Sequence, residues 1–318
     1  QSLMATLGVL LISCSPLHGL SKTSLDEFMA GSHLMMHHDS LKDKAISYRM
    51  QHPIEGTVSK FVKKVLVNGQ PADLYGRWFS YQVKLNPGKN VVKITCIGKN
   101  NRILDAELLR VLVKQRFLDV SSSHWTSQAV EDMATAGLLE DAMQPLMGPR
   151  QNVSLLALST ALFTSYGYDL VDEYRHLPAA KQYLLSAERV GLLDGISFQE
   201  QLSPEQPVTW GQALIILMNS EGLLRHRADE RSNPADRARR ALALAFEHGY
   251  LPGAAKAEIK LDAIISKAEL TYLLSHTTRY EQALASLYDW DSYLDANDRI
   301  FYQTIEKSKK ERNFDLTD

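Results

Sequence analysis

The chain has 318 residues, of which 45% are hydrophobic and 23% charged, a composition typical of globular proteins and a length that allows two or three domains. Its net charge of −2 hides an uneven distribution: residues 56–116 contain twelve Lys or Arg and three Asp or Glu, whereas residues 117–318 contain nineteen basic and twenty-nine acidic residues. The two cysteines, Cys14 and Cys96, exclude a disulfide framework, and neither lies in a metal-ligand spacing.

The N-terminal segment has the pattern of an export signal. Residues 3–13, LMATLGVLLIS, form an apolar run that is too short to span a bilayer but suits the hydrophobic part of a signal peptide. The chain begins at Gln1 without a Met or a basic segment, so we expect further residues to precede it. Residues 11–14, LISC, resemble a bacterial lipobox, which implies lipidation of Cys14. The alternative is a plain secretory signal with an incidental cysteine.

Residues 15–44 have the composition of a polar linker. His33, His37 and His38 lie close together in it and raise the question of a metal site. No carboxylate or cysteine completes a set of ligands, so we interpret these histidines as a solvated part of the linker and expect no metal.

Residues 45–115 have the pattern of short strands. Apolar and polar residues alternate, and turn signals such as Asn68-Gly69 interrupt them. This pattern predicts a small antiparallel β-sandwich. Its turn residues and inward aliphatic residues resemble those of bacterial Ig-like domains.

From residue 116 onward, apolar residues recur at helical spacing, and three predicted helices end at a glycine: Gly137, Gly191 and Gly249. A hydroxyl residue that begins a second helix follows these glycines after 17, 18 and 17 residues: Ser154, Thr209 and Ser266. A helix pair of this size cannot bury its own apolar face, so we expect three copies to pack against one another. The alternative is an ordinary helical bundle with chance similarity.

Two motifs in this half resemble the S-layer homology repeat of cell-envelope proteins. The first begins FLDV, and its matching residues are Phe117, Asp119, Val120, His124, Trp125 and Gly137. The second, ISKAE at residues 265–269, is similar to the Thr-Arg-Ala-Glu motif that opens a helix in that family. The resemblance covers roughly residues 117–279 and implies binding of peptidoglycan or a wall-attached polysaccharide.

The helix-opening motifs supply the candidate ligand residues. Ser266 is expected to cap its helix, Glu269 to complete a capping box, and Lys267 to present a cation outward, a position suited to an anionic or hydroxyl-rich ligand. In the second copy Trp210 stands where the family has its cation, and it is expected either to stack on a sugar ring or to pack inside the protein. The first copy has no charge there. The full glycan-binding set is Ser266, Lys267, Glu269, Thr209, Trp210 and Trp125.

Together these patterns predict a multidomain chain. A small antiparallel Ig-like β-sandwich is expected to precede an all-α domain of three S-layer homology repeats with pseudo-threefold organisation. The expected boundaries are 1–14 for the signal and lipobox, 15–44 for the linker, 45–115 for the sandwich, 116–279 for the repeats (about 116–169, 170–227 and 228–279) and 280–318 for a C-terminal helical tail.

The sequence favours a binding protein over an enzyme. No Ser-His-Asp order, Gly-rich phosphate loop or paired-carboxylate pattern stands out, so we expect no catalysis, no cofactor and no nucleic-acid partner. The leading hypothesis is a periplasmic or surface lipoprotein, anchored in the outer membrane, that tethers a membrane to the cell wall. The alternative is an accessory subunit of an envelope complex, whose degenerate repeats bind a protein instead of a glycan.

The lipobox generates the first testable prediction. Metabolic labelling with a fatty-acid analogue should mark the wild-type protein, because a lipobox cysteine becomes the acylated N-terminus. Cys14→Ala should abolish the label, whereas Cys96→Ala should keep it. Equal labelling of the wild type and Cys14→Ala, or labelling of neither, would show that Cys14 is not the anchor.

Overall fold

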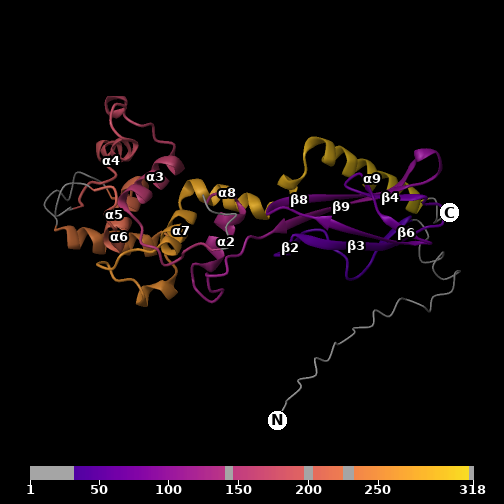
Figure 1. Cartoon of the computed structure of the whole chain (residues 1–318), viewed down its shortest axis with the longest axis horizontal. Coiled ribbons are helices and arrows are strands. Elements are labelled where there is room, and N and C mark those ends of the chain that lie inside the picture. The colour runs from indigo at the N-terminus through magenta and orange to yellow at the C-terminus, as the bar shows by residue number, and fades with distance from the viewer. Residues whose placement is uncertain (1–31, 140–145, 197–202, 225–232, 315–318) are drawn as a thin grey trace, which may run out of the picture.

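The computed structural model describes residues 32–139, 146–196, 203–224 and 233–314. They form a β region and a helical region that lie end to end, as Figure 1 shows. The last helix, α9 (Ala296–Phe314), returns from the helical region and lies against the β region. Cys14 lies outside the described residues. No helix in the described ranges is long and apolar enough to cross a membrane.

The β region consists of two packed sheets. One has four antiparallel strands in the order β1 (Leu34–Met36), β3 (Gln51–Val58), β7 (Trp78–Lys84) and β6 (Asp73–Tyr75). The other has five strands in the order β2 (Ala45–Ser47), β9 (Ile103–Val113), β8 (Gly88–Ile97), β4 (Lys64–Val67) and β5 (Gln70–Pro71). Successive side chains point to opposite faces of a strand, so alternate apolar residues such as Ile54, Phe79 and Val92 fill the space between the sheets.

The prediction of a small antiparallel Ig-like sandwich is wrong. β2 pairs with β9 in parallel, so the five-stranded sheet is mixed. β1 comes from residues 15–44, the segment whose composition indicates a linker, and it pairs with β3. Both strands are only three residues long, so they show too little alternation to be found from the sequence pattern. Their positions depend on long-range partners: Leu34 lies opposite Val58, and Ala45 opposite Val111.

The described helical region contains α2 (Ser127–Thr135), α3 (Leu155–Tyr166), α4 (Ala179–Arg189), α5 (Trp210–Ser220), α6 (Pro234–Glu247), α7 (Lys267–Ser275) and α8 (Thr278–Tyr288). The local stop and start signals are confirmed. The stops have positive φ angles of 70°, 81° and 78°, at Gly137, Gly191 and Gly249. The starts accept a hydrogen bond from the backbone N–H three residues later, at Ser154, Thr209 and Ser266.

The prediction of an all-α domain of three repeats with pseudo-threefold organisation is also wrong. The extended segments before α3, α5 and α7 form antiparallel β-bridges: Asn152–Ser266, Ser154–Pro207 and Thr209–Ile264. Buried backbone groups require partners, and an extended segment finds none in the helix that follows it, so these segments pair with one another. Burial is also unequal, because Val130 and Ala134 of α2 lie in a small cluster with Phe117, separate from the main helical core.

A buried ion-pair network joins the two regions. Lys114, directly after β9, has its Nζ 2.9 Å from an Asp132 oxygen and 3.6 Å from a Glu131 oxygen, both on α2. The three residues are only 8%, 7% and 8% exposed. Tyr288 of α8 donates to Asp132 (2.7 Å), and Tyr48 donates to Glu131 (3.0 Å). Burial alone would lower the pKa of Lys114, but the hydrogen bond to Asp132 and the charge of that carboxylate raise it above its ordinary value.

Removing the lysine should destabilise the whole chain. Lys114→Ala leaves two buried carboxylates without this cation, so we expect the free energy of unfolding in urea to fall by about 3–5 kcal/mol. Lys84→Ala, an exposed lysine on β7, should change it by less than about 0.5 kcal/mol. The pKa of Lys114 is higher in the folded than in the unfolded chain. Its contribution to the free energy of unfolding is therefore fully present below about pH 10.4 and is lost as the pH rises further.

A double variant tests the same network. Lys114→Met with Asp132→Leu removes both charges of the shorter pair, so it should be more stable than Lys114→Met alone. If Lys114→Ala unfolds at the same urea concentration as the wild type, the ion pair does not hold the regions together.

Candidate functional site

Trp125 and Trp210 come together, but only Trp125 is accessible. Their ring centroids are 6.5 Å apart. Trp210 is 2% exposed and belongs to the main helical core, so its ring has no face for a sugar, and the packing alternative holds for it. Trp125 is half-buried, and its Nε1–H donates to Glu258 Oε2 at 3.0 Å. Of the two predicted aromatic residues, Trp125 is therefore the one able to contact a ligand.

The predicted polar residues of the helix openings are occupied with capping. Glu269 Oε2 accepts from the Ser266 N–H at 2.8 Å, and the Glu269 N–H donates to Ser266 Oγ at 3.4 Å. Thr209 forms the same reciprocal box with Gln212, at 3.3 and 3.0 Å. These side chains satisfy N–H groups that a helix start leaves open, so their first role is to fix where α5 and α7 begin.

Lys267, the predicted outward cation, is only partly exposed. It is half-buried at the first position of α7, and its backbone N–H donates to Gln151 O at 2.9 Å. Its charge lies beside Asp119. Asp119 is exposed, and the little desolvation it undergoes would raise its pKa, but hydrogen bonds from the N–H groups of Met147 and Gly148, together with the Lys267 charge, lower it. The Lys267 charge thus acts on a residue of the first motif, although the two residues are far apart in the sequence.

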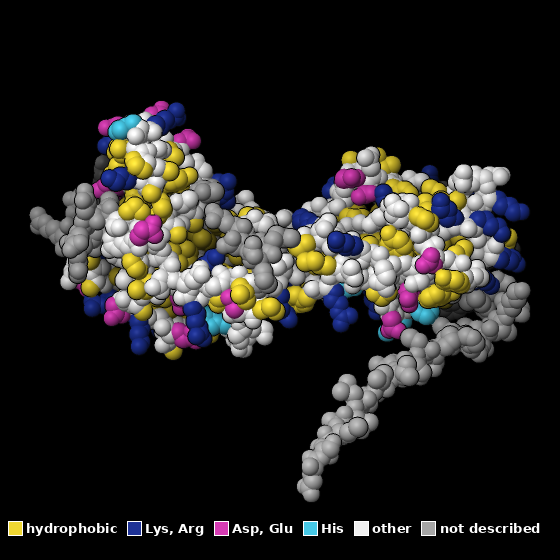
Figure 2. Space-filling model, viewed as in Figure 1, with side chains coloured by type: hydrophobic (Ala, Val, Ile, Leu, Met, Phe, Trp, Pro, Cys, Tyr) yellow, Lys and Arg dark blue, Asp and Glu magenta, His cyan; other side chains and the backbone are white. Residues whose placement is uncertain are grey.

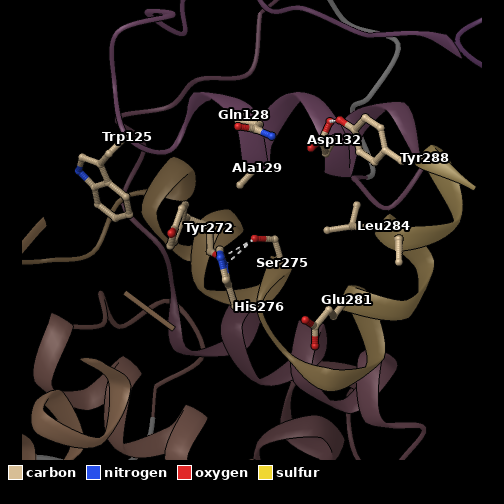
Figure 3. A pocket seen from close by; sticks show the side chains of 11 residues that line it. Trp125, Gln128, Ala129, Asp132, Tyr272, Ser275, His276, Glu281, Leu284 and Tyr288 are labelled. Carbon is tan, nitrogen blue, oxygen red and sulfur yellow. Dashed lines mark hydrogen bonds between the residues drawn. The ribbon is translucent and has the colours of Figure 1, made fainter. Parts of the chain in front are cut away.

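An open cavity of about 460 Å³ lies next to Trp125, between α2, α7 and α8 (Figure 3). Its lining residues are Trp125, Gln128, Ala129, Asp132, Tyr272, Ser275, His276, Glu281, Leu284, Ala285 and Tyr288. Trp125 and Tyr272 meet edge to face with ring centroids 4.7 Å apart, and Tyr272 and His276 lie 4.4 Å apart. We call the surface formed by Trp125, Tyr272 and His276 the aromatic wall.

Polar groups surround the aromatic wall. Gln128 of α2 and Glu281 of α8 are exposed, and Figure 3 shows them on different sides of the cavity. The His276 Nδ1 lies 2.9 Å from the Tyr272 carbonyl oxygen, which can only accept, so in the neutral ring Nδ1 carries the proton and Nε2 is an acceptor. The cavity thus combines ring faces with an amide, a carboxylate and an imidazole, a combination suited to a hydroxyl-rich ligand.

Sequence reasoning missed most of this cavity. Tyr272 on α7 and His276 directly after it follow the predicted ISKAE motif, and their spacing of four residues is the one signal that places them on the same side of the helix. Gln128 and Glu281 have no signal of their own, because only the packing of α2 and α8 beside α7 brings them to the cavity.

Thr209 lines a second cavity, of about 360 Å³, between α5 and α6. Its other polar groups include Gln212, which is engaged in the capping box, and Arg239, which pairs with Asp236 at 2.6 Å. In this cavity, the two polar side chains named are therefore already engaged in bonds within the protein, which makes it a weaker candidate for a ligand site than the cavity at the aromatic wall. Within the described ranges, no three His, Cys, Asp or Glu side chains are grouped to hold a metal ion.

Comparisons with known proteins give little further information. No family model and no curated protein matches the chain. The fibronectin(III)-like modules of Clostridium thermocellum CbhA are 16% identical over 25% of this chain and 94% of that chain, with a TM-score of 0.20. A family 76 glycoside hydrolase from a bovine Bacteroides thetaiotaomicron strain is 11% identical over 82% of this chain and 76% of that chain, with a TM-score of 0.17. Likenesses this weak support no argument about fold or function.

The capping box yields a prediction for stability. Glu269→Ala removes the carboxylate that accepts from the Ser266 N–H, so the free energy of unfolding should fall by about 1 kcal/mol. Glu281→Ala is the matched control, because Glu281 is exposed and should change stability by less than about 0.5 kcal/mol. Urea unfolding followed by circular dichroism measures both, and equal midpoints would show that the box contributes nothing.

Proposed function

We propose that this chain is a non-enzymatic cell-envelope lipoprotein that binds peptidoglycan or a wall-attached polysaccharide at the aromatic wall and so tethers a membrane to the cell wall. The observation that carries the proposal is the half-exposed aromatic wall beside a cavity of about 460 Å³ with polar groups around it. That volume lies in the range of ligand sites, roughly 300–1,000 Å³.

The chemistry of the cavity fits a sugar ring. A pyranose has an apolar face of C–H groups and an edge of hydroxyl groups, so it needs a ring to pack on and hydrogen-bond partners around it. Trp125 and Tyr272 offer the rings, while Gln128 and Glu281 offer an amide and a carboxylate. Residues 117–318 are predominantly acidic, which favours a neutral, hydroxyl-rich stretch of glycan over a strongly anionic one.

The resemblance to S-layer homology repeats supports the same class of ligand. Trp125 belongs to the first matching motif and forms part of the aromatic wall. Tyr272 lies on α7, the helix that the second motif opens, and His276 is the residue directly after that helix. The tethering role is supported by position, because the described chain begins in the β region and the cavity lies in the helical region (Figure 1).

A protein partner is the second candidate, and one observation favours it. Leu118, Leu146 and Ile264 lie close in sequence to the predicted motifs, and they are 82%, 58% and 44% exposed. Exposed apolar side chains indicate a protein-binding surface where they lie together, and the hydrogen bond from the Met147 N–H to Asp119 brings the segments of Leu118 and Leu146 together. On this alternative the chain is an accessory subunit of an envelope complex, and it does not bind glycan.

Sedimentation with purified sacculi tests the two candidates. The wild type should sediment with sacculi, and Trp125→Ala or Tyr272→Ala should weaken binding by about tenfold, because each removes a ring from the proposed contact. Tyr302→Ala, a 39% exposed tyrosine on α9, is the control and should bind like the wild type. Lys267→Ala asks separately whether the charge beside Asp119 contributes to binding.

The outcomes distinguish the candidates. Loss of binding in both aromatic variants, with unchanged circular dichroism, supports the aromatic wall. If Lys267→Ala alone weakens binding, the site lies at the Asp119–Lys267 pair instead. A wild type that stays in the supernatant rules out the tether and leaves the protein-binding alternative.

A further inference from the structure

The end of the β region that faces away from the helical region carries an exposed surface that the proposed glycan site does not use. We call it the basic tip, and its exposed side chains are Lys60, Lys63, Lys64, Lys99, Arg102, Phe61, Tyr75, Trp78 and Ile103. Figure 2 shows Lys and Arg side chains, in dark blue, gathered at this right-hand end of the molecule.

Strand register explains why these residues meet. Trp78 lies opposite Thr57 at the end of β3, and Lys64 lies opposite Ile97 at the end of β8. Residues 59–63 join β3 to β4, and five residues are too few to reach from one end of the sandwich to the other. The ends of both sheets therefore lie side by side, and the turn after β8, residues 98–102, lies with them.

The tip has an excess of positive charge. The ion pairs Arg110–Asp43, Lys93–Asp298 and Lys114–Asp132 of the described β region do not involve these five cations. Asp105, at this end of β9, is 3% exposed and accepts hydrogen bonds from Ser32 Oγ and the His33 N–H. Exposed Asp73 lies further along β6, two residues before Tyr75. The five exposed cations thus dominate the charge of the surface.

Large apolar side chains project among these cations. Tyr75 is 68%, Phe61 58%, Ile103 51% and Trp78 36% exposed. The rings of Tyr75 and Trp78 stack with centroids 6.3 Å apart, and Lys60 Nζ lies 5.5 Å from the centroid of Phe61. Aromatic rings favour the level of lipid headgroups, and lysines near an anionic bilayer are attracted to it. A surface that contains both is complementary to an anionic membrane.

We propose that the basic tip docks onto an anionic lipid bilayer, with its lysines at headgroup phosphates and its aromatic rings in the interface. The position of the N-terminal end of the described chain supports a membrane as the partner of the tip. Ser32, the first described residue, lies at the tip through its bond to Asp105, and Cys14 precedes it by 18 residues, a reach of at most about 60 Å. This reach argument rests on the lipid anchor of the proposed function, whereas the tip residues themselves take no part in the proposed glycan site.

Co-sedimentation of the full chain with vesicles tests this proposal. The wild type should bind vesicles of phosphatidylcholine with phosphatidylglycerol better than vesicles of phosphatidylcholine alone, and added salt should weaken the difference. The triple variant Lys60→Ala, Lys63→Ala, Lys64→Ala should lower the partition coefficient on the order of 100-fold, since each lysine near an anionic surface contributes about fivefold. Phe61→Ala should lower it by about tenfold, because it removes a side chain from the interface.

A second triple variant serves as the control, because it loses the same charge and keeps the same N-terminal segment as the tip variant. The variant Lys84→Ala, Lys256→Ala, Lys260→Ala also removes three exposed lysines, but from positions away from the tip, and it should bind vesicles like the wild type. All proteins keep residues 1–31, so the apolar run contributes equally to each.

Three results would overturn the proposal. They are equal binding of wild type to both vesicle types, equal loss in the two triple variants, and binding of soluble polyphosphate without retention on vesicles. The vesicles contain no wall glycan and the sacculi contain no bilayer, so failure of this proposal and failure of the glycan site are observed separately.

Discussion

Lys114 extends from the end of β9 and places its ammonium group against two carboxylates of α2, Asp132 at 2.9 Å and Glu131 at 3.6 Å. Burying three charges is costly unless each has a partner at close range, and here each carboxylate also accepts a hydrogen bond, from Tyr288 and Tyr48 respectively. The network therefore favours the one arrangement of β9, α2 and α8 in which these charged groups and hydroxyl groups meet. A separate apolar cluster, in which Leu112 meets Leu287 and Tyr293, reinforces the same junction.

The geometry of the candidate site follows from this junction. Asp132 and Gln128 are four residues apart on α2, so the helix that meets Lys114 also lines the cavity. On α8, Leu284 and Tyr288 are also four residues apart. Tyr288 donates a hydrogen bond to Asp132, and Leu284 lines the cavity. The β region thus contributes to the site without touching a ligand, because it fixes two of the three helices that form the cavity.

The two proposed surfaces lie in different regions of an elongated molecule. The basic tip is the end of the β region where the described chain begins, and the aromatic wall lies in the helical region (Figures 1 and 2). Their chemistry differs as well: the tip combines cations with exposed rings, whereas the cavity combines rings with an amide, a carboxylate and an imidazole. The buried ion pairs and the apolar cluster between the two regions hold the two surfaces apart.

Features that depend on neighbouring residues were readable from the sequence. Asn68 and Gly69 turn a hairpin with φ angles of 50° and 79°, and Ser266 caps α7 with Glu269, because the atoms involved lie within a few residues. The motif also made Trp125 a candidate ligand residue, and the structure places it at the cavity. Tertiary structure alone decided that Trp210 is buried, that Tyr272 and His276 line a cavity, and that β2 lies parallel to β9. Each of those outcomes depends on which distant segment packs against the residue, and spacing along the chain carries no information about that partner.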